Sequence, residues 1–231
     1  MTLHHVVEGD GAAVVLIGSL GSTLAMWEPQ LEALGGRRVL RVDLPGHGGS
    51  PVPDRPVTIA DVGRAVLALV DGPASYCGLS LGGVVAMWIA AHAPVEKLVL
   101  ACTKPAFPPA EQWRERADLV RRDGMAAIAD AVASRWFAGE PPRRYREMLL
   151  HCDPEGYARC CEALADADLH EDLRRIEAPT LVIAGGEDPT VTADDARTLP
   201  GRLVVLERAA HLASADDPGG FNAALLEHLA A

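Results

Sequence analysis

The sequence predicts an α/β fold, a mostly parallel sheet with helices on both faces and a helical segment inserted into the second half. Short runs rich in Val and Leu recur without polar alternation, as is typical of strands buried on both faces. Helix-like stretches separate these runs, which favours parallel strands joined by crossovers. Between Thr103 and Ala178 the alternation stops and the pattern is helical throughout.

Each element follows from its own residues. We expect strands over Val14–Ile17, Val39–Val42, Ala74–Gly78, Leu98–Ala101, Thr180–Ala184 and Leu203–Leu206. We expect helices over Trp27–Leu34, Thr58–Val70, Leu81–His92 and Ala193–Leu199. Thr58 followed by Asp61 resembles a capping box at the start of the second helix. Near the N-terminus, Leu3–Val7 and Ala12–Ile17 flank Glu8-Gly9-Asp10-Gly11, a pattern that predicts a β-hairpin.

The length of 231 residues fits one domain with an excursion. We expect residues 1–102 and 179–231 to form the core, with residues 103–178 inserted as a helical cap of about four helices. Such a cap would stand over the carboxyl edge of the sheet, where α/β proteins bind ligands. The alternative is a separate small helical domain.

Composition limits the partners. The formal net charge is −11, which argues against nucleic acid, because phosphate binding needs clustered Lys and Arg. No apolar run is long enough for a membrane span, and no basic leader precedes one, so we expect a soluble, cytoplasmic protein. The five cysteines lack disulfide or zinc spacing; we expect reduced thiols, with Cys77 and Cys102 buried. Oligomeric state stays open.

The most informative motif is Gly78-Leu79-Ser80-Leu81-Gly82, directly after an expected strand and before an expected helix. In this setting the pattern predicts a nucleophile elbow, a sharp turn that exposes a serine hydroxyl. The flanking glycines provide room for the strained backbone.

A serine hydroxyl needs a base to remove its proton, and a carboxylate to orient that base. The elbow motif resembles that of α/β-hydrolases, in which the order along the chain is Ser, acid, His, with both partners on loops after late strands. His211 is the only histidine directly after a late strand, and Asp188-Pro189 is the best-placed acid, although Glu187, Asp194 and Asp195 are close by. His47 follows a strand but precedes the serine, and we expect it to order its own glycine-rich loop.

Acyl transfer also requires donors for an oxyanion. The backbone amide of Leu81, directly after the serine, would supply one donor. The loop Gly18–Ser22 would supply the second, with the amide of Leu20 as the candidate. The Gly-x-x-Gly fragment in this loop lacks the third glycine and the ribose-binding acid of a dinucleotide site. Nothing in the sequence requires a cofactor or a metal.

These residues resemble the α/β-hydrolase superfamily along essentially the whole chain, and more narrowly its 3-oxoadipate enol-lactonases. The segments that carry the narrower resemblance are Gly18–Trp27, Cys77–Gly83, Gly124–Phe137, Pro154–Asp168 and Ala178–Pro189. The chain has Pro45 before Gly-His-Gly, where similar enzymes often carry an arginine. The resemblance implies attack by Ser80 on the carbonyl of a small lactone, an acyl-enzyme intermediate, and release of 3-oxoadipate.

A substrate of this kind carries a free carboxylate, so a small-molecule site with at least one cation is expected. Arg135 and Arg144 in the cap are the candidates by type and region, with a surface arginine as the alternative for each. Trp136 could wall the pocket or pack between cap helices. The alternatives are a carboxylic-ester, thioester or C–C bond hydrolase of the same fold. A non-catalytic ligand sensor on a hydrolase fold also remains open.

Overall fold

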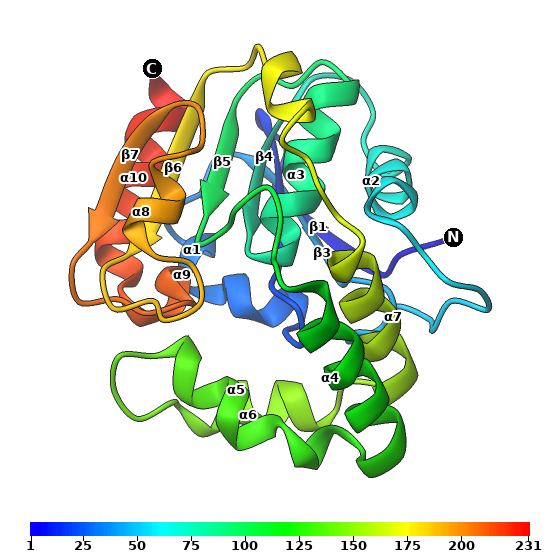
Figure 1. Ribbon diagram of the computed structural model, residues 1–231. Coiled ribbons are helices and arrows are strands. Elements are labelled where there is room, and N and C mark those ends of the chain that lie inside the picture. Colours follow the sequence, from blue (N-terminus) through cyan, green and yellow to red (C-terminus); the bar gives the residue numbers. More distant parts are fainter.

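The computed structural model describes residues 1–231 and contains a seven-stranded sheet of order β1-β3-β2-β4-β5-β6-β7 (Figure 1). The strands are β1 (His5–Glu8), β2 (Ala13–Ile17), β3 (Arg38–Val42), β4 (Ala74–Leu79), β5 (Leu98–Ala101), β6 (Thr180–Gly185) and β7 (Arg202–Leu206). Every neighbouring pair is parallel except β1 with β3. The expected α/β fold with a mostly parallel sheet is therefore confirmed, and each of the six expected strands is present.

The expected N-terminal hairpin is wrong. Strand β1 pairs with β3 rather than with β2, in a register that places His5 opposite Val42. Strand β2 instead lies between β3 and β4, and its residues Val14–Ile17 are fully buried. The glycine-rich segment after β1 reverses the chain, with Gly9 at φ +76°. A reversal of the chain between β1 and β2 does not require these two strands to pair. The apolar strand β3 lies between them, where it buries more surface than it would at the edge of the sheet.

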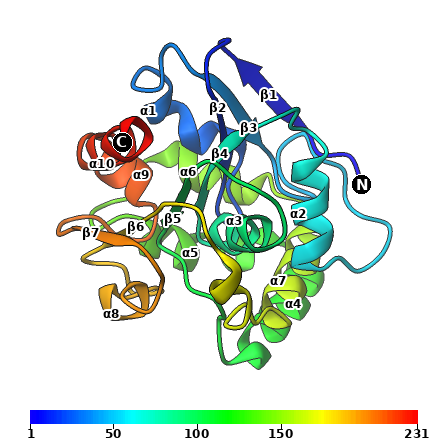
Figure 2. The same cartoon turned by 90° about the horizontal axis from the view of Figure 1, so that it is seen from above.

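Helices cover both faces of the sheet (Figure 2). Helices α2 (Ile59–Leu67) and α3 (Leu81–His92) lie on one face, and α1 (Glu28–Leu31) and α10 (Pro218–Ala230) lie on the other. The capping box of Thr58 and Asp61 is present at the start of α2. Short helices complete the core: the 3₁₀ turn Leu24–Trp27, α8 (Ala193–Ala196), α9 (Ala213–Asp216) and the 3₁₀ turn Asp172–Arg175. Helix α3 is buried over most of its surface and positions the residue that precedes it, Ser80.

The inserted segment forms α4 (Ala110–Asp123), α5 (Ala129–Trp136), α6 (Arg143–Leu150) and α7 (Pro154–Ala165), with a 3₁₀ turn at Met125–Ala127. We call α4 to α7 the cap helices. They lie beyond the carboxyl ends of the parallel strands (Figure 1). Side chains from these helices can therefore reach the loops that follow the strands.

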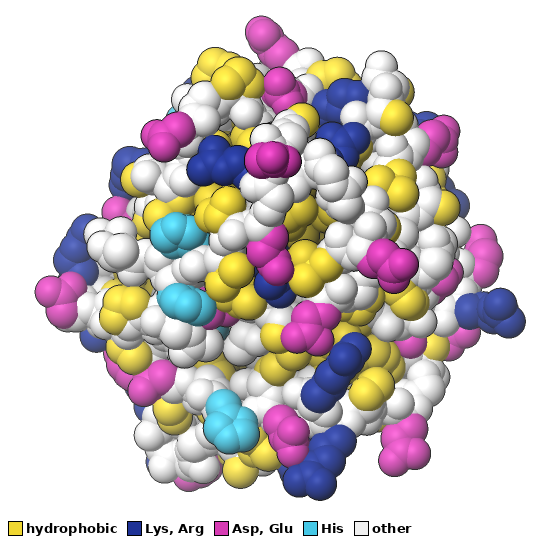
Figure 3. All heavy atoms as spheres, turned by 180° about the vertical axis from the view of Figure 1, so that it is seen from behind, with side chains coloured by type: hydrophobic (Ala, Val, Ile, Leu, Met, Phe, Trp, Pro, Cys, Tyr) yellow, Lys and Arg dark blue, Asp and Glu magenta, His cyan; other side chains and the backbone are white.

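Acidic and basic side chains are interspersed over the surface, as Figure 3 shows for one face. Many of them form ion pairs, most at exposed positions. All five cysteines are free thiols, and Cys77 and Cys102 are buried, as expected; Cys152, Cys160 and Cys161 are buried as well. None of the helices combines the length and the apolar character that crossing a bilayer requires.

Candidate active site

Ser80 lies in the sharp turn between β4 and α3, with φ +57° and ψ −118°, a backbone conformation that few non-glycine residues adopt. The two flanking glycines are required by close backbone contacts. A Cβ on Gly78 would lie 2.1 Å from the carbonyl oxygen of Gly82, and a Cβ on Gly82 would lie 2.1 Å from that of Ile17. The strand, the turn and the helix form the elbow that the Gly-x-Ser-x-Gly pattern predicts.

The structure brings Ser80, His211 and Asp188 into one hydrogen-bonded chain. His211 Nε2 lies 2.9 Å from Ser80 Oγ, and His211 Nδ1 lies 2.7 Å from Asp188 Oδ2. The three residues are at most 5% exposed. A carboxylate only accepts, so Nδ1 carries the ring proton and Nε2 is free to accept the serine proton.

The other carboxylate oxygen atom of Asp188 is held by the backbone. Asp188 Oδ1 accepts hydrogen bonds from the N–H groups of Thr190 (2.7 Å) and Val191 (3.0 Å). The competing acids are occupied elsewhere or exposed: Glu187 is exposed, Asp194 pairs with Arg197, and Asp195 caps helix α8. Asp188 is therefore the carboxylate that orients His211.

The loop that carries His211 is attached to the end of cap helix α5. The N–H of His211 donates to the carbonyl of Arg135 (3.3 Å), and the N–H of Leu212 donates to the carbonyl of Trp136 (2.9 Å). The cap thus supports the histidine through the backbone of the same two residues that were expected to contact substrate.

The backbone N–H groups of Leu20 and Leu81, the two expected oxyanion donors, have no acceptor in the protein. Leu81 is the first residue of α3, and N–H groups in the first turn have no acceptor within the helix. In the loop Gly18–Ser22, the N–H groups beside Leu20 are occupied: Gly21 donates to His47 Nε2 (2.9 Å) and Ser22 donates to the carbonyl of Ser19 (3.1 Å). The Leu20 N–H has no acceptor in the protein, and Leu20 borders the same pocket as Ser80.

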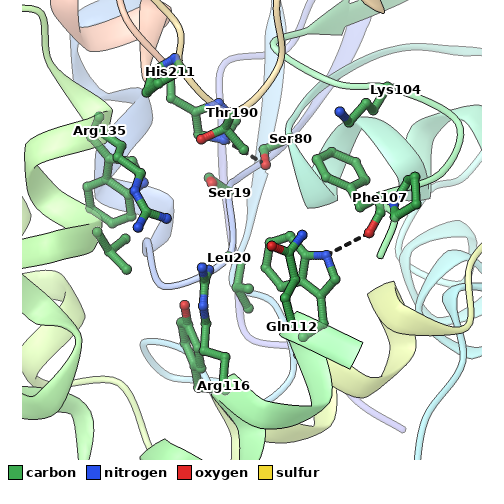
Figure 4. Close-up of a pocket in the computed structure, with 16 residues that line it drawn as sticks. Ser19, Leu20, Ser80, Lys104, Phe107, Gln112, Arg116, Arg135, Thr190 and His211 are labelled. Carbon is green, nitrogen blue, oxygen red and sulfur yellow. Dashed lines mark hydrogen bonds between the residues drawn. The ribbon is translucent and has the colours of Figure 1, made fainter. Parts of the chain in front are cut away.

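Above Ser80 is a cavity of about 230 Å³ between the sheet edge and the cap. Arg116 from α4 and Arg135 from α5 point into it from different sides, and Lys104 lies near Ser80 (Figure 4). Lys104 forms an ion pair with Asp195 (3.5 Å), whereas no carboxylate lies within ion-pair distance of Arg116 or Arg135. The pocket of this acidic protein therefore presents two unpaired guanidinium groups.

Of the three residues expected near the pocket, two line the cavity and one does not. Arg135 and Trp136 line the cavity, and Trp136 is also buried against the cap. Arg144 is outside the cavity: it lies 3.7 Å from Glu28 and over the ring of Tyr145, so of the two interpretations left open for it, the surface arginine is the correct one. The sequence on its own does not show which face of a cap helix meets the sheet.

Sequence analysis missed Lys104 and three residues of α4 that line the pocket, Gln112, Trp113 and Arg116. Trp113 was the available signal, because it is one of few aromatic residues and lies three positions from Arg116, on the same helix face. The guanidinium carbon of Arg116 lies 4.6 Å from the centre of the Trp113 ring. No group of three or more His, Cys, Asp or Glu side chains is arranged to hold a metal ion.

The fold and the hydrogen-bonded Ser, His and Asp define a class, and comparison with known proteins agrees with it. Residues 14–224 match the model of the alpha/beta hydrolase family, and the chain belongs to this family. It is 37% identical to 3-oxoadipate enol-lactonase 2 of Acinetobacter baylyi, over 94% of this chain and 88% of the relative.

Comparison with solved structures also finds an enol-lactonase and a related hydrolase among the similar proteins. The enol-lactonase from Burkholderia xenovorans superposes with a TM-score of 0.95 at 36% identity, covering 99% of this chain and 96% of that chain. A hydrolase from Pseudomonas aeruginosa has a TM-score of 0.94 at 39% identity, covering 99% and 94%. The chain is thus an α/β-hydrolase that resembles enol-lactonases.

Proposed function

We propose that this protein is a serine hydrolase that opens 3-oxoadipate enol-lactone to 3-oxoadipate. The observation that carries the proposal is the Ser80–His211–Asp188 chain beneath a cavity with two unpaired guanidinium groups. The similarity to enol-lactonases supports the choice of substrate. The proposal includes a role in the cytoplasmic β-ketoadipate pathway of aromatic breakdown.

In the first half of the reaction, His211 Nε2 takes the proton of Ser80 as Oγ attacks the lactone carbonyl. The oxyanion that forms accepts hydrogen bonds from the amides of Leu20 and Leu81. When this intermediate collapses, the bond from the carbonyl carbon to the ring oxygen breaks. His211 returns the proton to the leaving enol, which tautomerises to the ketone while the acyl group stays on Ser80.

In the second half, His211 removes a proton from water, which attacks the acyl-enzyme. The second tetrahedral intermediate uses the same two amides. When it collapses, the bond from the carbonyl carbon to Ser80 Oγ breaks, His211 returns its proton to Oγ, and the new acid leaves as a carboxylate. Asp188 keeps its charge throughout and stabilises the imidazolium through Nδ1. Both halves need one proton shuttle and no other reactant than water.

The carboxylate of the substrate would be bound by Arg116 and Arg135. No carboxylate of the protein pairs with either guanidinium group, so neither must break an ion pair to receive an anion. Arg116 is the better oriented of the two, since the Trp113 ring restrains its guanidinium. Trp136 would form the apolar wall beside the lactone ring.

The first test is steady-state hydrolysis of the enol-lactone, generated in situ, beside p-nitrophenyl acetate. We expect high kcat/KM on the lactone and a loss of at least about 10³-fold in Ser80→Ala, because the nucleophile is removed. Ester cleavage without preference for the lactone would discard the substrate but keep the hydrolase. If neither substrate is hydrolysed, an unrelated acyl substrate or a role as a ligand sensor would be favoured.

A second test separates the substrate from the chemistry. Arg116→Gln and Arg135→Gln should each raise KM for the lactone by about 10-fold or more, because a charge-assisted hydrogen bond is lost. Hydrolysis of p-nitrophenyl acetate, which has no carboxylate, should change little. Arg144→Gln is the matched control, since Arg144 lies outside the cavity. If all three variants behave alike, the guanidinium groups do not select the substrate.

A further inference from the structure

His47 is a fully buried histidine that the proposed reaction does not use. Its ring nitrogen Nδ1 lies 2.9 Å from the carbonyl oxygen of Pro45, and its Nε2 accepts the N–H of Gly21 at 2.9 Å. A carbonyl can only accept and an N–H can only donate, so Nδ1 carries the proton and Nε2 carries none. These two partners define a neutral ring, and burial lowers the pKa of His47, which favours the same form.

The Gly21 N–H belongs to the loop Gly18–Ser22, which we call the oxyanion loop. Leu20 lies between two peptide planes of this loop. The plane before it is held because the Ser19 carbonyl accepts from the N–H of Ser22 (3.1 Å) and from Ser22 Oγ (2.7 Å). The plane after it is held only through the Gly21 N–H, by His47.

These two restraints decide where the Leu20 N–H points. In a planar trans peptide the C=O and N–H point in opposite directions, so the Leu20 N–H points away from Ser22. Holding the next plane through Gly21 stops the backbone of Leu20 from rotating. The N–H of Gly82, at the start of α3, donates to the Gly18 carbonyl (3.1 Å) and fixes the same loop against the elbow.

We propose that His47 is a positioning residue for the oxyanion loop: its neutral ring accepts the Gly21 N–H and thereby keeps the Leu20 amide aimed at the reacting carbonyl. The inference rests on the proposed function, because it assigns the Leu20 amide to the oxyanion. It extends our expectation for His47, whose bond to Pro45 does order its own loop, to a second loop 26 positions away in the chain.

Two substitutions separate the two bonds. His47→Asn keeps a donor near the position of Nδ1, facing Pro45, but has no atom that reaches Gly21. His47→Gln places an acceptor oxygen near the position of Nε2, facing Gly21. If His47 acts only on its own loop, Asn should be the better replacement; if it positions the oxyanion loop, Gln should be.

With p-nitrophenyl acetate we expect His47→Asn to lose at least about 10-fold in kcat with little change in KM, up to the 10²–10³-fold cost of losing an oxyanion donor. His47→Gln should retain kcat within about threefold, because the acceptor is restored. The proposal is overturned if Asn keeps the wild-type kcat, or if Gln falls as far as Asn while both variants unfold as cooperatively as the wild type.

Hydrogen exchange at the Gly21 amide tests the same bond without any turnover. We expect Gly21 to exchange faster in His47→Asn and at the wild-type rate in His47→Gln, because only the Asn variant lacks the acceptor. Equal protection in the two variants overturns the proposal, even if the wild type hydrolyses neither substrate. An inactive wild type with the expected exchange pattern would instead reject the proposed function.

Discussion

At the scale of single residues, backbone contacts decide what can change around Ser80. A Cβ on Gly82 would meet three atoms where β2 runs into the oxyanion loop: the carbonyl oxygen of Ile17 at 2.1 Å, its carbon at 2.5 Å and the carbonyl oxygen of Gly18 at 2.6 Å. All three are backbone atoms and cannot rotate away. The first turn of α3 and the oxyanion loop therefore approach this closely only because position 82 is glycine.

We expect Gly82→Ala to lower the free energy of unfolding by about 1–3 kcal/mol, as overpacking does. We also expect kcat to fall at least about 10-fold, because the start of α3 must move away from the loop that holds Leu20. Urea unfolding and ester hydrolysis would measure both effects. Gly139→Ala is the control, since nothing lies within 4 Å of a Cβ there. Equal behaviour of the two variants would contradict the argument.

At the scale of elements, cap helices α4 and α7 are joined by one arginine. Arg121 of α4 donates to Glu155 through Nε (2.7 Å) and also contacts Glu162, both on α7. These two carboxylates raise the pKa of Arg121, and the hydrogen bond from Arg121 lowers the pKa of Glu155. Because α4 carries Arg116 and α7 carries Tyr157, this contact connects two elements that line the cavity.

We expect Arg121→Gln to lower the free energy of unfolding by about 0.5–1 kcal/mol at low salt, since the group is partly exposed and screened by solvent. At high salt the difference from the wild type should shrink. Arg122→Gln is the control, because Arg122 pairs only with its neighbour Asp123. Urea unfolding at two salt concentrations checks this, and an unscreened or absent difference would argue against the bridge.

At the scale of the whole molecule, the buried neutral His47 makes stability depend on pH. Burial holds the pKa of His47 below 6.5, the ordinary value that the unfolded chain has. Below pH 6.5 the imidazole of His47 binds a proton in the unfolded state but stays neutral in the folded state. The free energy of unfolding therefore falls as pH falls from about 6.5 toward the pKa of the folded state. Asp43 and Asp153 lie near the ring and oppose part of this shift.

We expect the slope of unfolding free energy against pH, between about pH 7 and 5.5, to be smaller in His47→Gln than in the wild type, by at most about 1.4 kcal/mol per pH unit. His151→Gln is the matched control, since His151 is exposed. Urea unfolding at several pH values measures the slope. The same slope in all three proteins would show that His47 titrates equally in both states.

Much of the arrangement around Ser80 could be predicted from local patterns. The apolar run Ala74–Gly78, the Gly-x-Ser-x-Gly turn and the apolar helix Leu81–His92 each depend on residues close together in the chain. The positions of His211 and Asp188 followed from chain order, because parallel strands bring the loops after them to one edge of the sheet. The structure places both side chains in contact with each other and His211 in contact with Ser80.

The sequence by itself thus determined the α/β fold, the elbow and the residues that meet at it, since short-range periodicity and strand order specify these. Only the tertiary structure decided that β1 pairs with β3, that Arg116 rather than Arg144 faces the cavity, and that His47 holds Gly21. The physical reason is that these three outcomes depend on how distant segments pack. Packing energies are shared among many weak contacts, so no local pattern records them.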